Sequence, residues 1–145
     1  MGEWCAARQI AAPPYIRAVL DPAAPEPEST AILAALRLGP GERIAFRHVR
    51  LMCGGQTLSD ARNWYVPARL TAEMNQILET TQTPFGKVAG PLGFTRERLT
   101  AQRGRSAECP AGTVLSHSAV LRLADGRAIS LVVECYTRAN LTRRR

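Results

Sequence analysis

Two charged residues interrupt apolar, strand-like segments of the sequence and are its main candidates for chemistry. Glu134 lies inside the run LVVECY, and a carboxylate buried there must find a partner or stay protonated, because an unpaired buried charge costs several kcal/mol. Arg47 alternates with Val49, Leu51 and Cys53, so its guanidinium is expected to point inward, where its planar fork matches a carboxylate. Either the two side chains pair with each other across a sheet, or they line a site for an anion.

A second group of cations lies in the stretch 81–102, which joins a Thr-Pro pair, a glycine and a basic segment. Pro84 suits the first turn of a short helix, and Gly86 permits close approach of the backbone. Lys87, Arg96 and Arg98 then either face solvent on a plain helix-to-strand connection or form the rim of a pocket that holds an anion.

The two histidines are weaker candidates. With a two-residue turn at Asp125–Gly126, His117 falls opposite Glu134 on one sheet face, where a structural hydrogen bond is favoured over tuning of the carboxylate. His48 has the parity opposite to Arg47 and is expected at the surface or under a helix.

Several common site types have no counterpart in the sequence. It shows no Ser-His-Asp arrangement, no Gly-rich phosphate loop and no cluster with metal-ligand spacing, which argues against common hydrolases and nucleotide enzymes. No metal site is therefore expected. The four cysteines are far apart and form no C-x-x-C pair, so we expect reduced thiols in a cytoplasmic protein, with Cys53 and Cys135 as small core residues.

Composition indicates an ordinary globular chain of 145 residues, with 46% hydrophobic and 21% charged residues. The net charge of +7 comes partly from a basic C-terminus and otherwise from scattered arginines, and no basic, aromatic-interleaved motif accompanies it, so no nucleic-acid partner is expected. The start of the chain does not resemble a signal peptide, and no run approaches the roughly 20 apolar residues of a membrane span. The oligomeric state is open, with a monomer favoured.

The periodicity predicts an α+β protein in which an antiparallel sheet of at least five strands is flanked by helices. Strands are expected from 43 to 53 and after the Gly54–Gly55 turn, across 90–102, and on both sides of the Asp125–Gly126 turn. Short helices are expected at 30–39, capped by Ser29 and Thr30, and after Thr71. We divide the chain into an Ala/Pro-rich N-terminal segment (1–28), one domain (29–141) and a basic tail (142–145).

Several motifs, taken together in this order, resemble bacterial chorismate pyruvate-lyase. They are TPFGK at 83–87, LGFTRERL at 92–99 and AVLRLADGRAISLVVECYTRANL at 119–141, preceded by RHVRLMCGG at 47–55 and NWYVP at 63–67. The resemblance covers roughly residues 43–141. It departs from the family in the N-terminal segment and in a Gly54–Gly55 hairpin whose return strand is one residue longer.

The resemblance implies a chorismate lyase-like fold and the elimination of pyruvate from chorismate to give 4-hydroxybenzoate for ubiquinone biosynthesis, without a cofactor. Carried over by position, the substrate-binding arginine falls on Arg47 and the active-site glutamate on Glu134. A backbone contact falls on Ala89, and Lys87 stands where the lyases often have arginine. Arg96 or Arg98 is the expected second contact to the carboxylate substrate.

Two other functions remain open on the sequence. The same fold occurs as the effector-binding domain of GntR-type transcription regulators, so the chain could be a non-catalytic module that binds an aromatic or carboxylate ligand. Those regulators carry a winged helix before this domain, and we expect no segment of this chain to form one. The interpretation of the chain as a complete transcription regulator is therefore less favoured. The remaining possibility is a structural or interaction protein with an incidental Arg-Glu pair. A closed apolar cavity around that pair would count against it.

Overall fold

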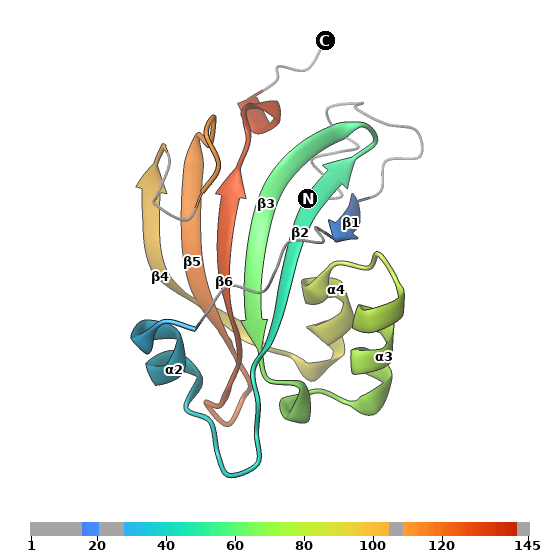
Figure 1. The fold of residues 1–145 in the computed structure, drawn as a ribbon, viewed down its shortest axis with the longest axis vertical. Helices are drawn as coiled ribbons and strands as arrows, with labels where there is room; N and C mark the ends of the chain where they lie inside the picture. The colour runs from blue at the N-terminus through green and yellow to red at the C-terminus, as the bar shows by residue number, and fades with distance from the viewer. Residues whose placement is uncertain (1–15, 21–27, 105–108, 142–145) are drawn as a thin grey trace.

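The computed structural model describes residues 16–20, 28–104 and 109–141 (Figure 1). The strands are β1 (Ile16–Leu20), β2 (Ala45–Cys53), β3 (Gln56–Tyr65), β4 (Thr95–Arg103), β5 (Leu115–Arg122) and β6 (Ala128–Tyr136). The helices are α2 (Thr30–Leu36), α3 (Ala72–Thr80) and α4 (Phe85–Ala89), with 3₁₀ turns at Pro67–Arg69, Gly90–Leu92 and Arg138–Leu141. None of the helices in these ranges is long and apolar enough to cross a bilayer.

The strands form one six-stranded antiparallel sheet in the order β1-β2-β3-β6-β5-β4. The predicted α+β fold is therefore confirmed. The segment 1–28, to which no strand was assigned from the sequence, contributes the edge strand β1, which pairs with β2.

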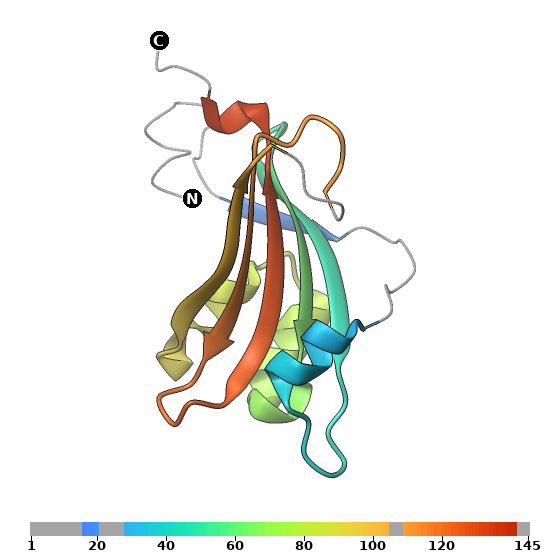
Figure 2. The same cartoon turned by 90° about the vertical axis from the view of Figure 1, so that its left-hand side faces the viewer.

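Helices cover both faces of the sheet, α2 on one and α3 with α4 on the other (Figure 2). The caps agree with the sequence: Ser29 accepts a hydrogen bond from the Ile32 N–H, and Thr71 accepts one from the Met74 N–H. On the α3–α4 face, buried Met74 and Leu78 pack in one cluster with Tyr65 and Phe85. On the α2 face, Ile32 and Leu36 pack over a second cluster that contains Trp64 and Leu131.

The register of the strands confirms one predicted pairing and shows three irregularities, one of which lies between Leu121 and Arg122 on β5. His117 lies opposite Glu134, as expected. The ladder between β2 and β3 shifts between Leu51 and Met52, which accommodates the extra residue of the return strand. The expected extended segment 90–102 is partly wrong, because Gly90–Leu92 forms a 3₁₀ turn around Pro91 and a second bulge lies between Arg98 and Thr100.

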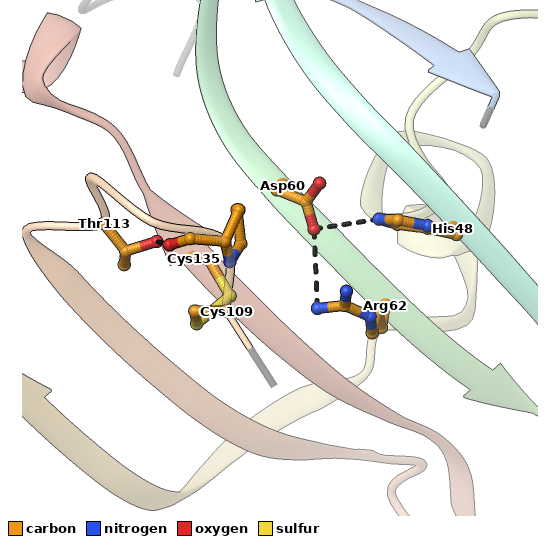
Figure 3. The surroundings of a disulfide bond; sticks show 7 residues. His48, Asp60, Arg62, Cys109, Thr113 and Cys135 are labelled. Carbon is orange, nitrogen blue, oxygen red and sulfur yellow. Dashed lines mark hydrogen bonds and ion pairs between the residues drawn. A yellow bond between two sulfur atoms is a disulfide. The ribbon is translucent and has the colours of Figure 1, made fainter. Parts of the chain in front are cut away.

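The expectation of reduced thiols is wrong. Cys109 and Cys135 form a disulfide (Figure 3), and Cys53 is also disulfide-bonded. Cys109 belongs to the connection between β4 and β5, and Cys135 lies on β6, so the bond ties this connection to the middle of the sheet. Residues that are distant in the sequence meet here only through the fold, which spacing alone does not show.

Candidate functional site

A small cavity of about 120 Å³ lies on the α3–α4 face of the sheet. Its floor comes from β2, β3 and β6, and its cover comes from 84–86 and from residues at the start of β4. Most of the wall is apolar, including Val49, Phe85, Phe94 and Val132. Four polar side chains also reach it: Arg47, Asn63, Arg96 and Glu134.

Arg47 is the most unusual of these polar side chains, because it is only 5% exposed and is poorly paired. Its Nη2 donates to the carbonyl oxygen of Thr83 at 3.0 Å, while Nε and Nη1 have no hydrogen-bond partner among the described residues. Burial lowers the pKa of the Arg47 guanidinium from its usual value, because desolvation disfavours the charged form. A buried cation with two unpaired donor nitrogens at an apolar cavity can donate hydrogen bonds to an anion.

Glu134 pairs with Arg96 and not with Arg47. The Glu134 Oε1 lies 2.8 Å from Nη2 of Arg96, whose side chain is 42% exposed at the rim of the cavity. The hydroxyl of Tyr136 donates a hydrogen bond to Oε2 of the same carboxylate. The alternative in which Arg47 and Glu134 satisfy each other across the sheet is therefore wrong, and Arg47 Nε and Nη1 keep no hydrogen-bond partner among the described residues.

Tyr136 and His117 extend this polar group along the sheet. Burial raises the pKa of Tyr136, and the neighbouring charge and hydrogen bond of Glu134 act in the same direction. The His117 ring meets the Tyr136 ring edge-on, with centroids 5.4 Å apart. His117 thus packs against the partner of the carboxylate.

Arg47, Arg96 and Glu134 are brought together by the fold, whereas two other predicted site residues lie apart from the cavity. Lys87 is exposed on α4. Ala89 is fully buried at the end of that helix, where it packs in the core cluster and does not line the cavity. The TPFGK segment acts through other groups, since the Thr83 carbonyl holds Arg47 and Phe85 forms part of the cavity wall.

Asn63 was missed by the sequence analysis. It lies on β3 directly opposite Arg47 and is 4% exposed, and neither Nδ2 nor Oδ1 has a hydrogen-bond partner among the described residues. Counting outward from the Gly54–Gly55 turn places Arg62 opposite Arg47, and only the bulge shifts Asn63 into that position. Two features of the sequence could have indicated Asn63: it directly precedes the apolar run WYV, and the return strand of the hairpin is one residue longer.

A larger hollow of about 700 Å³ lies between α2 and the β5–β6 turn, and three of the four arginines that line it are held in ion pairs. Arg69 binds Glu42, and Arg127 binds Asp125. On the same face of the sheet, His48 lies 2.9 Å from Asp60, which also neighbours Arg62 (Figure 3). Among the described residues, no three His, Cys, Asp or Glu side chains are grouped so that they could hold a metal ion.

Comparisons with known proteins show sequence similarity to an uncharacterized protein and structural similarity to domains of transcriptional regulators. It is 43% identical to the uncharacterized protein y4mC of Sinorhizobium fredii over 157 aligned positions, which cover 94% of this chain. The chain spans 66% of the length of that relative. No protein-family model matches the chain.

Solved structures share the fold at low sequence identity. The effector domain of PhnF from Mycobacterium smegmatis aligns with a TM-score of 0.61 and 12% identity, over 85% of this chain and 81% of that one. A GntR-family transcriptional regulator from Bacillus cereus aligns at 0.57 and 13%, over 86% and 92%. The possible transcriptional regulator YydK of Bacillus subtilis aligns at 0.60 and 16%, over 86% of this chain and 60% of that one. The chain thus has the chorismate lyase-like fold of such effector domains.

Proposed function

We propose that the chain is a small-molecule-binding module whose cavity takes an organic carboxylate. The observation that carries this proposal is the buried Arg47 guanidinium, which keeps two donors unpaired at the cavity. A carboxylate would accept both hydrogen bonds and neutralise the buried charge. The apolar walls would cover the rest of the ligand.

The size of the cavity supports a ligand built around a single ring. The volume of about 120 Å³ is close to that of an engineered apolar cavity of about 150 Å³ that binds benzene. Benzoate and its small derivatives are therefore suitable probes. The neighbours described as an effector domain and as transcriptional regulators support binding as a role for this fold.

Isothermal titration of the purified protein with benzoate tests the proposal. We expect binding that is lost in Arg47→Met, which replaces the guanidinium by an uncharged chain of similar length. Arg98→Met is the matched control, because Arg98 is an exposed arginine of β4 that does not line the cavity. Unchanged binding in Arg47→Met, with both variants folded, would contradict the proposal, as would the absence of binding by any small aromatic acid.

Chorismate pyruvate-lyase activity is the second candidate, and the shared cavity of Arg47 and Glu134 favours it. In that role Arg47 would bind a carboxylate of chorismate, and Glu134 would donate a proton or hydrogen bond to the departing ether oxygen. Its present contacts with Arg96 and Tyr136 both use Glu134 as an acceptor, and chorismate is larger than benzoate. Both points support the binding module over the lyase.

Incubation with chorismate separates the two candidates. Pyruvate and 4-hydroxybenzoate, followed by chromatography, would form together if the chain is a lyase. Their loss in Arg47→Ala and in Glu134→Gln would assign the reaction to these residues, and full activity in Glu134→Gln would rule out its proton role. We expect no turnover together with binding of small acids.

The cytoplasmic location inferred from reduced thiols loses its basis with the disulfide between Cys109 and Cys135. Such bonds form and persist in oxidising compartments and are rare in the cytosol of mesophiles. We therefore propose that the protein functions in an oxidising compartment. Thiol counting by mass spectrometry on protein alkylated directly in cells tests it, because a cytosolic protein would show Cys109 and Cys135 alkylated.

A further inference from the structure

Asn63 presents a hydrogen-bonding requirement that a simple carboxylate does not meet. The side chain is 4% exposed and lines the cavity, and both its Nδ2 and its Oδ1 lack partners among the described residues. Because buried polar groups are normally hydrogen-bonded, this amide marks a place for a polar group of a ligand.

The register places Asn63 next to Arg47. The two residues are direct cross-strand partners on β2 and β3, on the face that carries the cavity. Side chains in this relation have Cβ atoms about 5 Å apart. A ligand whose carboxylate meets Arg47 therefore offers its neighbouring substituent to Asn63.

The donor and acceptor groups of the Asn63 amide limit which type of substituent can pair with it. Its NH₂ needs an acceptor and its carbonyl oxygen needs a donor. A carboxylate shared with Arg47 would satisfy the NH₂ alone, and an ammonium group would satisfy the carbonyl alone. A hydroxyl group both donates and accepts, and it adds only one heavy atom to a ligand that must fit about 120 Å³.

We propose that Asn63 makes the site selective for a hydroxy acid, in which the hydroxyl group is close to the carboxylate that Arg47 binds. This inference rests on the proposed carboxylate-binding function and specifies its ligand class. Arg47 supplies the charge complement, and Asn63 distinguishes a hydroxylated acid from its parent. Sites built to hydrogen-bond a hydroxyl group discriminate against the analogue that lacks it, because their polar groups are then left unpaired.

Titration with benzoate and with its 2-, 3- and 4-hydroxy derivatives tests the selectivity. In the unmodified chain we expect the 2- or 3-hydroxy isomer to bind about tenfold more tightly than benzoate, the effect of one well-formed hydrogen bond. The 4-hydroxy isomer holds its hydroxyl group at the opposite end of the ring and should lack this advantage. In Asn63→Leu the preference should disappear, while benzoate binds at least as well as before.

Two further variants keep the test decisive. Ser59→Ala is the matched control, since Ser59 is a fully buried residue on the same strand and face whose hydroxyl also lacks a described partner but does not line the cavity. It should retain the preference. Asn63→Thr keeps a donor and an acceptor on a side chain suited to a strand, and should retain part of the preference if Asn63→Leu does not fold.

The outcomes separate this inference from the function on which it rests. Equal affinity for benzoate and all three hydroxybenzoates, or an unchanged preference in Asn63→Leu, would overturn the role of Asn63 and leave carboxylate binding intact. Binding that persists in Arg47→Met would instead overturn carboxylate binding at this cavity. Absence of binding by all four acids would overturn both.

Discussion

Arg47 and Arg69 are two arginines of similar burial with opposite surroundings. The Arg69 side chain is 6% exposed and donates to both carboxylate oxygens of Glu42 and to three backbone carbonyls, those of Leu36, Arg37 and Ala128. Arg47 is 5% exposed and donates to one carbonyl, that of Thr83. One guanidinium is saturated by the protein, whereas the other keeps two nitrogens unpaired.

This difference separates an arginine that stabilises the fold from one to which we assign a ligand-binding role in our proposal. Arg69 joins the end of α2, the following loop and the start of β6, so its contacts are completed within the chain. Arg47 faces a cavity with largely apolar walls, and no carboxylate among the described residues forms an ion pair with it. A saturated guanidinium stabilises the native state, whereas an unsaturated one costs stability until an anion binds.

Replacement of Arg69 should give the largest effect on stability. Arg69→Met removes the donor from the carbonyls of Leu36 and Ala128, and we expect a loss of about 3 kcal/mol in the free energy of unfolding from two unpaired carbonyls. Urea titration followed by tryptophan fluorescence measures it. A loss below about 1 kcal/mol would remove the structural role assigned to Arg69.

The same substitution at Arg47 should have a much smaller effect on folding. Methionine fills much of the same volume and removes a buried charge that has few partners, so the free energy of unfolding should change by less than about 1 kcal/mol or increase. The same urea titration gives the value. If Arg47→Met destabilised the chain as much as Arg69→Met, the contrast between the two sites would fail.

The pairing of Arg69 should also appear in the pH dependence of stability. Its hydrogen bonds, followed by that of the Gly39 N–H, lower the pKa of Glu42 from 4.5 to about 2. Since the folded-state pKa is depressed, the stabilising contribution is present above about 4.5 and is lost as the pH falls toward 2.

Thermal melts across this pH range should therefore show a decrease in melting temperature that Glu42→Gln reduces. Arg69→Met should reduce the same component, because it removes the main cause of the shift. Identical pH profiles for the unmodified chain and both variants would show that this pair does not contribute to acid sensitivity.

The smallest effect is expected at the rim of the cavity. Arg96→Gln breaks the ion pair with Glu134, but the Arg96 side chain is 42% exposed, and exposed pairs contribute about 0.5 kcal/mol or less. We expect a nearly unchanged unfolding curve and less than a threefold change in benzoate affinity. A larger loss of affinity would move the principal anion contact from Arg47 to Arg96.

The sequence predicted five of the six strands and the inward-facing Arg47, and it missed β1 and the groups around Arg47. Alternation along 47–53 identified an inward-facing arginine, and the pairing of His117 with Glu134 was predicted correctly. The predicted two-residue turn was wrong, because Leu123 pairs with Arg127 across a longer loop and a register shift between Leu121 and Arg122 restores the pairing. The bulge at Leu51 moved Asn63 into the site, which counting from a hairpin turn does not predict. The choice of Arg96 as the partner of Glu134 depends on side-chain reach between strands β4 and β6, which are not neighbours in the sheet.

The Cys109–Cys135 disulfide has a practical consequence for anyone who prepares this protein. Cys135 lies between Glu134 and Tyr136 on β6, and its partner is 26 residues earlier, so the bridge encloses the whole of β5. Expression in a reducing cytosol, or purification with a thiol reductant, would yield a sample in which this bridge is open. Each binding assay should therefore report the thiol content of its sample, because oxidised and reduced preparations are chemically different molecules on the strand that carries Glu134.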